Sequence, residues 1–407
     1  MPDRQLPFCP HLDQLRNQAK DLLRDVRAGE PSALADFREF HPERIGPALA
    51  ALADAQLVLA RSYRASSWPQ LTAVVDAITA IARDDFGTLR DVAAGLPALA
   101  RDRDRPRDGW RAALASAADA AIRRLMLQLR ERGAHSADAL LARPDLQPVL
   151  DTLRLLGRVG GSPAADWVGG SVEVLRGSDF ALLAEIGADV RASLGWTALA
   201  LETYARDPAG KHRILDVMAS HGVPLPDSPP MALHRGRLDL LEAHLRRDPA
   251  LLARTFSHED IYPPSLACHD AHELALHGAP LAGATLLHMA VDYEDLEVAR
   301  WLLDHGAEVN ARAHVDADGF GGHTALFNCV VTYNAGRADE PLARLLLERG
   351  ADPNARASLR QALPCSRDKS LHEYRDVTPI GWGGQFHDQG MVSHGALRLI
   401  AEHGGHE

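Results

Sequence analysis

The sequence is poor in the residues that would crosslink it or anchor it in a membrane. Its four cysteines lie far apart in 407 residues, with no C-x-x-C pair. This spacing argues against a disulfide framework or a four-cysteine zinc site and fits a reducing compartment. The N-terminus lacks the apolar core of a signal peptide, and the most apolar run, residues 46–60, is too short to span a bilayer. We therefore expect a soluble, cytoplasmic protein.

Aromatic residues and lysines are scarce as well. Aromatics make up 5% of the chain, while alanine and leucine dominate the apolar 46%, which favours helices over strands. Only Lys20, Lys211 and Lys369 are lysines, so nearly all positive charge comes from arginine. The formal net charge is −11, and the sequence has no long tail of one sign. This balance argues against binding to nucleic acid or to an anionic membrane.

The clearest internal pattern lies at residues 285–313, TLLHMAVDYEDLEVARWLLDHGAEVNARA. Thr285 opens a short helix, residues 293–295 form a loop, and a second helix with apolar residues at helical spacing ends at Gly306. The segment resembles an ankyrin repeat, whose signature T-P-L-H-x-A recurs about every 33 residues. One such unit cannot bury its apolar face alone, so the resemblance implies neighbouring repeats. It also implies that the imidazole of His288 hydrogen-bonds loop backbone.

Helix-opening and helix-closing residues extend this pattern along the chain. Glycines that can adopt positive φ follow six apolar helical segments, at Gly133, Gly187, Gly222, Gly306, Gly350 and Gly404. The matching helix openings lie at Thr197, Ser228, Thr285, Thr324 and Thr378. Thr378 lies 54 residues after Thr324, which indicates an inserted loop within the array. The predicted fold class is all-α: an ankyrin-repeat solenoid of about six to eight degenerate repeats with hairpin fingers.

The first 80 residues differ, and we expect them to form a helical capping module. One helix should end at Gly29, a second should open at Pro31, a third at Pro47, and a fourth should be capped by Ser67. This segment resembles one that precedes ankyrin arrays in bacterial proteins, and that resemblance implies no activity. The array is expected over residues 81–407, with degenerate repeats in 81–230, a polar insertion in 255–283, the best-matching repeats in 285–357 and the last repeat in 377–407.

The resemblance also predicts where a partner would bind. Ankyrin arrays usually bind other macromolecules, and their fingers and first helices line a concave face. The ends of the first helices and the glycine-rich finger 312–323 should face it, with Phe320 as an exposed aromatic anchor. The predicted binding residues are His234, Arg235, Asp292, Tyr293, Phe320, His323, Val331 and Thr332. Their mixed chemistry suits a protein partner rather than a nucleic-acid duplex, and we expect a monomer.

A metal-dependent enzyme is the alternative hypothesis. Residues 258–277, HEDIYPPSLACHDAHELALH, form the densest polar segment of the chain. His269 and His272 would share one face of a helix, and Asp270 and His277 could complete a site for a divalent metal such as zinc. The two prolines favour a loop, however, and no H-E-x-x-H, nucleophile elbow, dinucleotide fingerprint or P-loop occurs. The main expectation is therefore a recognition surface without a cofactor.

Overall fold

The computed structural model describes residues 4–7, 9–94, 109–131, 143–160, 165–191, 193–269, 279–335, 339–362 and 368–407. The chain divides into two compact units, described separately below. The first unit comprises residues 1–168 and 182–189, and the second comprises residues 169–181 and 190–407. Among the described residues, no helix is both long and apolar enough to cross a membrane.

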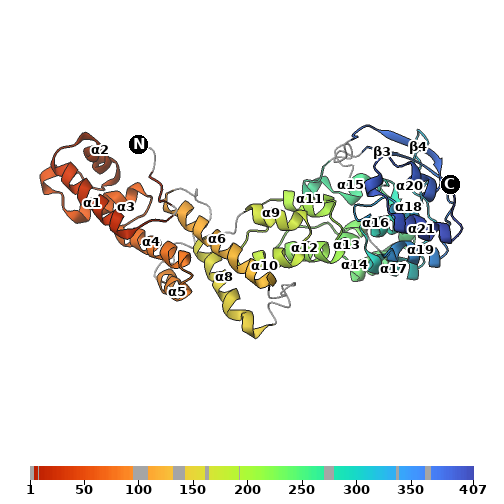
Figure 1. Ribbon diagram of the computed structural model, residues 1–407, viewed down its shortest axis with the longest axis horizontal. Helices are drawn as coiled ribbons and strands as arrows, with labels where there is room; N and C mark the ends of the chain where they lie inside the picture. Colours follow the sequence, from red (N-terminus) through yellow and green to blue (C-terminus); the bar gives the residue numbers. More distant parts are fainter. Residues whose placement is uncertain are drawn as a thin grey trace. The chain divides into compact units, whose positions relative to one another are not determined.

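The first unit is built from helices (Figure 1). They are α1 (Leu12–Arg27), α2 (Pro31–Phe40), α3 (Leu52–Ser62), α4 (Trp68–Ala82), α5 (Phe86–Ala94), α6 (Trp110–Glu131) and α8 (Gln147–Gly160). Two further helices, α9 (Ala165–Glu173) and α10 (Gly177–Glu185), each contain residues of both units. Helix α4 packs against both α5 and α6, so the domain boundary predicted near residue 80 falls inside the first unit.

The sequence signals at the start of the chain correspond to local structure in most cases. Gly29 has a φ of +82° just after α1, and α2 begins at Pro31. The hydroxyl of Ser67 caps α4 by accepting the backbone N–H of Gln70 at 3.3 Å. The expected helix start at Pro47 was wrong. That proline begins a single 3₁₀ turn, and α3 starts only at Leu52.

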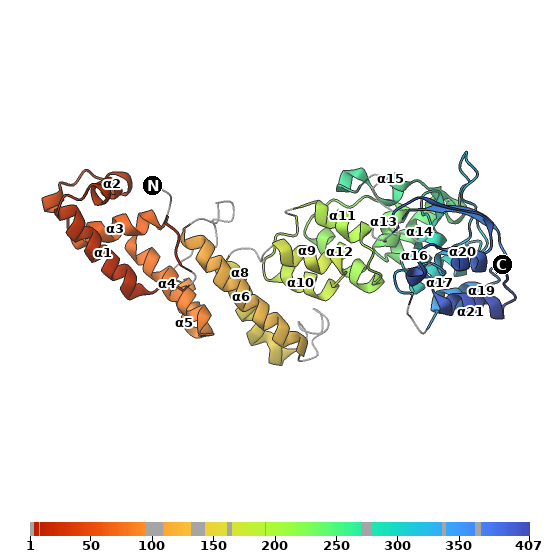
Figure 2. The same cartoon turned by 45° about the horizontal axis from the view of Figure 1, so that its top comes forward.

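The second unit contains five successive helix pairs in its described residues. They are α11 (Gly195–Glu202) and α12 (Pro208–Ser220), α13 (Pro229–His234) and α14 (Leu238–Arg247), α16 (Leu286–Asp292) and α17 (Leu296–Asp304), α18 (Ala325–Asn328) and α19 (Pro341–Glu348), and α20 (Pro379–Gln385) and α21 (His394–Glu402). First helices contact one another in the order α13, α16, α18, α20 (Figure 1), and second helices in the order α17, α19, α21 (Figure 2). Each pair therefore covers the apolar side of its neighbour.

The ends of these helices follow the expected pattern. Four of the five predicted opening residues occupy N-cap positions: Ser228, Thr285, Thr324 and Thr378. The fifth helix start was predicted too far along the chain, because α11 begins at Gly195 rather than at Thr197. The predicted closing glycines within the described residues all have positive φ: Gly187, Gly222, Gly306, Gly350 and Gly404. Gly133 lies outside the described residues.

Two asparagines show that neighbouring repeats are related in space. The side chain of Asn310 donates to the carbonyl of Gly350 at 3.0 Å and accepts the backbone N–H of Asp352 at 2.8 Å. Asn354 makes the same two contacts one repeat later, with the carbonyl of Gly404 at 3.0 Å and the backbone N–H of His406 at 2.9 Å. Each asparagine thus ties the end of one helix pair to the closing turn of the next.

Strands correct the all-α expectation in one respect. Two antiparallel pairs occur in the second unit: β1 (Thr255–Phe256) with β2 (Ala284–Thr285), and β3 (Ala357–Gln361) with β4 (His372–Val377). In β3 the buried and partly exposed side chains alternate, as expected for a strand with one face on the core. The long insertion before Thr378 therefore contains a β-hairpin, and the 255–283 insertion contains β1 and the short helix α15 (His258–Ile261).

Candidate functional site

A groove of about 580 Å³ lies between the fingers of the second unit. We call it the finger groove. Its lining comes from the insertion, from the glycine-rich finger and from β3, and comprises Thr255, Phe256, Ser257, His258, Pro280, Ala282, Gly283, His314, Asp316, Phe320, Gly321, His323, Leu359 and Arg360. The apolar side chains Phe256, Phe320 and Leu359 are buried, whereas Ser257 and His314 are exposed. The groove therefore combines an apolar floor with polar groups at its rim.

Backbone hydrogen bonds connect successive fingers along this groove. The N–H of Gly283 donates to the carbonyl of Phe256 at 2.7 Å, and the N–H of His314 donates to the carbonyl of Gly283 at 2.8 Å. Gly321 then donates its N–H to the carbonyl of Ser358 at 2.6 Å, on β3. The bonds link the insertion, the glycine-rich finger and the β3–β4 hairpin into one ribbon. We call these linked segments the finger ribbon.

Glycine is required where the finger turns back on itself. Gly321 has a φ of +119°, and a Cβ atom there would lie 2.0 Å from the carbonyl oxygen of His314. Gly319 in the same turn has a φ of +84° but has no neighbouring atom within 4 Å of a Cβ position. Both glycines therefore allow a backbone conformation that other residues rarely adopt. Gly321 also allows the chain to pass close to its Cα atom, which Gly319 does not need to do.

Phe320 is buried, so the expected exposed anchor is not what the structure shows. The guanidinium carbons of Arg360 and Arg375 lie 4.9 Å and 4.2 Å from the centre of its ring. Arg360 in turn pairs with Asp316 at 2.6 Å and with Asp318 at 3.1 Å. The backbone N–H of Phe320 is the largest cause that lowers the pKa of Asp316 below its usual range. The carboxylate therefore stays ionised and holds Arg360 over the groove floor.

Two buried histidines, His288 of α16 and His323 of the glycine-rich finger, lie next to each other at the finger ribbon. His288 contacts Thr285 Oγ1 through Nδ1 at 2.9 Å and the carbonyl oxygen of His323 through Nε2 at 3.0 Å. This confirms the loop-backbone role that the repeat signature implies. Burial is the main cause that lowers the pKa of His288 to about 4 and that of His323 to about 3. Both imidazoles are therefore neutral at physiological pH and serve as structural groups.

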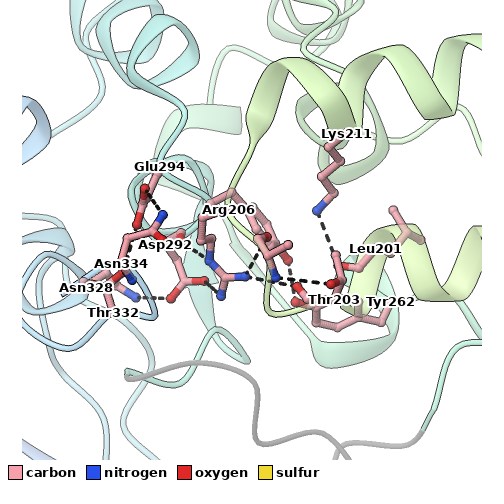
Figure 3. A network of polar contacts seen from close by, with 12 residues as sticks. Leu201, Thr203, Arg206, Lys211, Tyr262, Asp292, Glu294, Asn328, Thr332 and Asn334 are labelled. Atoms are coloured by element: carbon pink, nitrogen blue, oxygen red, sulfur yellow. Dashed lines mark hydrogen bonds and ion pairs between the residues drawn. The ribbon is translucent and has the colours of Figure 1, made fainter. Parts of the chain in front are cut away.

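A buried polar network lies at the ends of the first helices, and Arg206 is at its centre (Figure 3). Its guanidinium donates to the backbone carbonyl of Asp292 at 2.8 Å and to the carboxylate of the same residue at 3.1 Å. It also donates to the carbonyl of Thr203 at 3.1 Å. Asn328 of α18 donates to the Asp292 carboxylate at 3.4 Å. The network thus joins the α11–α12 pair to the α16–α17 and α18–α19 pairs through one buried ion pair.

The same network contains a buried lysine. The Nζ atom of Lys211 lies 3.7 Å from the centre of the Tyr293 ring and 3.4 Å from the carbonyl oxygen of Leu201. Burial, followed by the nearby charge of Arg206, lowers the pKa of Lys211 well below its usual value. The Tyr293 hydroxyl is hydrogen-bonded to that of Tyr262, and burial raises the pKa of both phenols. These groups therefore favour their neutral forms inside the unit.

The insertion is fastened across the first helices by polar contacts. The carbonyl oxygen of Ile261 in α15 lies 3.0 Å from Nε2 of His234. Farther along, the buried carboxylate of Glu202 accepts the backbone N–H of His269 at 2.6 Å and lies 2.7 Å from its Nδ1. The residues between Thr255 and His269 consequently cover part of the face that a bare repeat array would expose.

Burial by the chain itself changes how the predicted binding residues can be interpreted. Six of the eight are buried: His234, Asp292, Tyr293, Phe320, His323 and Val331. Arg235 and Thr332 are partly exposed, and each is paired, Arg235 with Asp216 at 2.9 Å and Thr332 with Glu294 at 2.9 Å. Phe320 and His323 meet at the finger groove, whereas Asp292 and Tyr293 belong to the Arg206 network.

The metal hypothesis stays a prediction. Asp270, His272 and His277 lie outside the described residues, and His269 contacts Glu202. Within the described ranges, no group of three or more His, Cys, Asp or Glu side chains is placed to hold a metal ion.

The buried polar residues Arg206, Lys211 and Glu202 were not predicted from the sequence. All three lie in the degenerate part of the array, where no repeat signature marks them. One signal was available for Lys211, which shares a helical face with the apolar residues Ile214, Leu215 and Met218 of α12. A lysine on an apolar stripe predicts either a partner or a shifted pKa.

Comparison with known proteins bears on the second unit. Residues 250–357 match the family model of ankyrin repeats, in three copies. The match covers the insertion, α16 to α19 and the glycine-rich finger. No curated protein sequence matches this chain.

Proposed function

Because residues 250–357 make this chain an ankyrin-repeat protein, we propose that it is a scaffold that binds a protein partner through the finger groove. Ankyrin repeats are in general protein-interaction modules, and their fingers and first helices form the usual contact surface. The observation that carries the proposal is the groove itself, with its apolar floor and its exposed His314 at the rim. Apolar centres with polar rims are typical of protein interfaces.

The predicted binding residues have different roles in this proposal. Phe320 and His323 shape the floor of the groove, and the part-exposed Arg235 and Thr332 contact the partner at the ends of the first helices. The buried residues His234, Asp292, Tyr293 and Val331 hold that surface from beneath.

The wider predictions belong to the same proposal. The array would reach six to eight repeats, with helix pairs on both sides of the matched segment, and would work as a monomer. A net charge of −11 disfavours nucleic acid as the partner. A reducing compartment such as the cytoplasm suits the free thiols of Cys268 and Cys329.

A site-specific photocrosslinker in living cells tests where the partner binds. Benzoylphenylalanine would replace His314 at the groove rim or, as the control, Glu242 on the exposed side of α14. We expect a discrete protein adduct from position 314 and none from position 242. Adducts from position 242 alone would reject the groove as the binding surface.

Charge reversal then tests the contribution of the groove to affinity. With the crosslinked partner purified, Arg360→Glu should weaken binding at least about tenfold, because it removes the cation that covers Phe320 and faces Asp316. Arg246→Glu makes the same charge change on α14 and should alter the dissociation constant less than about twofold. Equal effects of the two variants would show that net charge, and not the groove, determines affinity.

A further inference from the structure

Two histidines stack where the β3–β4 hairpin meets the last helix pair. The rings of His372 in β4 and His387, which follows α20, have centroids 4.1 Å apart and planes inclined by 7°. The Tyr374 oxygen lies 2.8 Å from Nδ1 of His387 and accepts the backbone N–H of the same residue at 3.0 Å. We call these three side chains the histidine clasp. It fastens β4 to the segment after α20.

Aromatic rings enclose the clasp on the side of α20. Tyr374 contacts Trp382 edge to face at 4.8 Å, and Phe386 lies 4.6 Å from the His387 ring. Trp382 and Phe386 are both buried, so His387 has an apolar wall on this side. A charge on its ring would lack the solvation that water provides.

The charged neighbours of the clasp lie toward its open side. The carboxylate of Asp368 is 2.8 Å from Nε2 of His372 and also accepts the hydroxyl of Ser370 at 2.6 Å. The charge of Asp368, and after it that of Asp388, favours the charged form of His387 and opposes the larger effect of burial on its pKa. Elsewhere on β4, Glu373 and Arg375 pair with each other at 3.0 Å. Asp368 therefore contacts His372 directly and acts on His387 through its charge.

Protonation of His387 would oppose the geometry of the clasp. The charged ring would present a proton on both nitrogens. A proton on Nδ1 would exclude the hydrogen bond that the Tyr374 hydroxyl can donate to the neutral ring, and the Tyr374 oxygen would have to accept both this proton and the backbone N–H of His387. Nε2 is buried and has no hydrogen-bond partner within the described residues. Burial, and after it the charge of His372, lowers the pKa of His387 below its ordinary value.

We propose that the histidine clasp is an acid-sensitive latch, which holds the β3–β4 hairpin on α20 while His387 is neutral and releases it when that ring is protonated. In the released hairpin His387 regains its ordinary pKa of about 6.5. The latched state binds fewer protons, so its stability is complete above that pH and falls as the pH decreases toward the lower pKa of the latched ring.

Release of the latch would alter the finger groove. Gln361 pairs with His372 across the hairpin, and Leu359 pairs with Tyr374. Leu359 and its neighbour Arg360 line the groove, so movement of this strand removes one wall. Partner binding should therefore weaken in acid. This consequence rests on the proposed function, whereas the latch itself does not.

Hydrogen exchange on the full chain without a partner tests the latch. After correction for the intrinsic pH dependence of exchange, protection of β3 and β4, residues 357–361 and 372–377, should fall from pH 7 to pH 5. Once the pH lies below both pKa values of His387, the fall should be about tenfold for each unit that separates them. Residues 286–304 should keep their protection. In His387→Gln, which cannot titrate, protection of the hairpin should not change with pH.

Histidine NMR makes the test independent of any loss of packing in the variant. In the ¹³C-histidine spectrum of the unmodified protein, the signal absent from His387→Gln should titrate with a midpoint below 6.5. A midpoint at or above 6.5, or equal pH dependence of hairpin exchange in both proteins, would overturn the latch. A confirmed latch with pH-independent partner binding would instead contradict the groove.

Discussion

Arg206 and Arg349 each form an ion pair in the second unit, and the two pairs differ chiefly in burial. The Arg206–Asp292 side chains are 2% and 4% exposed with a separation of 3.1 Å. The Arg349–Asp304 side chains are 36% and 52% exposed and lie closer together, at 2.7 Å. Distance alone would predict that the exposed pair contributes more to stability than the buried pair. Burial reverses this order, because an uncompensated charge costs far more inside a protein than in water.

Truncation of the two arginines measures this difference. Arg206→Ala should lower the free energy of unfolding by about 3–5 kcal/mol, because the Asp292 carboxylate loses its cation while it remains buried. Arg349→Ala should cost less than about 1 kcal/mol, since water replaces the lost partner. Urea denaturation followed by circular dichroism gives both values. Similar losses for the two variants would contradict a structural role for the Arg206 network.

Single-residue expectations depended on what covers each side chain. His288 was predicted correctly because its partners come from the repeat itself: the hydroxyl of Thr285 three residues earlier, and the carbonyl of His323 at the opening of the next repeat. The exposure of Phe320 was predicted wrongly because Arg360 and Arg375, which cover it, belong to a hairpin that the repeat pattern does not contain. Contacts within the repeat could be read from the sequence, and contacts from insertions could not.

At the scale of elements, the glycine-rich finger offers a matched pair of positions. Gly321→Ala should displace the finger, because the new Cβ would lie 2.0 Å from the His314 carbonyl oxygen. Gly319→Ala also faces a positive φ but meets open space, so its cost should be limited to about 1–2 kcal/mol of backbone strain. Hydrogen exchange should show faster exchange at residues 313–323 and 357–361 in the first variant.

The control for this experiment lies in the β1–β2 pair. Gly283 connects β2 to the finger through His314, whereas Thr255 and Thr285 pair with each other directly. Exchange at Thr285 should therefore stay close to its original rate in both glycine variants. If Gly319→Ala loosened residues 357–361 as much as Gly321→Ala did, backbone strain rather than close approach would determine the shape of the finger.

Insertions explain why some elements could be predicted and others could not. The capping residues Ser228, Thr285, Thr324 and Thr378 identified helix starts, because an N-cap acts within one turn of its own helix. The β3–β4 hairpin had no such local signal. Its register depends on contacts such as Leu359 with Tyr374, which are 15 residues apart in the chain and are separated by residues outside the repeat.

At the scale of the whole molecule, the division into two compact units predicts that a destabilising substitution affects mainly the unit that contains it. Leu71 in α4 and Leu302 in α17 are both fully buried, one in each unit. Truncation of either leucine to alanine should cost about 2–5 kcal/mol, because it removes buried methyl groups and leaves a cavity. The two substitutions are chemically identical, so any difference in their effects reports the organisation of the chain.

Hydrogen exchange in low urea measures how far each effect spreads. Leu302→Ala should accelerate exchange in α16 to α19 and leave α1 to α4 unchanged, whereas Leu71→Ala should do the reverse. Within the second unit, acceleration should decrease with distance along the stack, because each helix pair contacts mainly its neighbours. Equal acceleration in all helices would mean that the chain unfolds as one cooperative body. A cavity in either unit would then destabilise the finger groove as much as it destabilises α1 to α4.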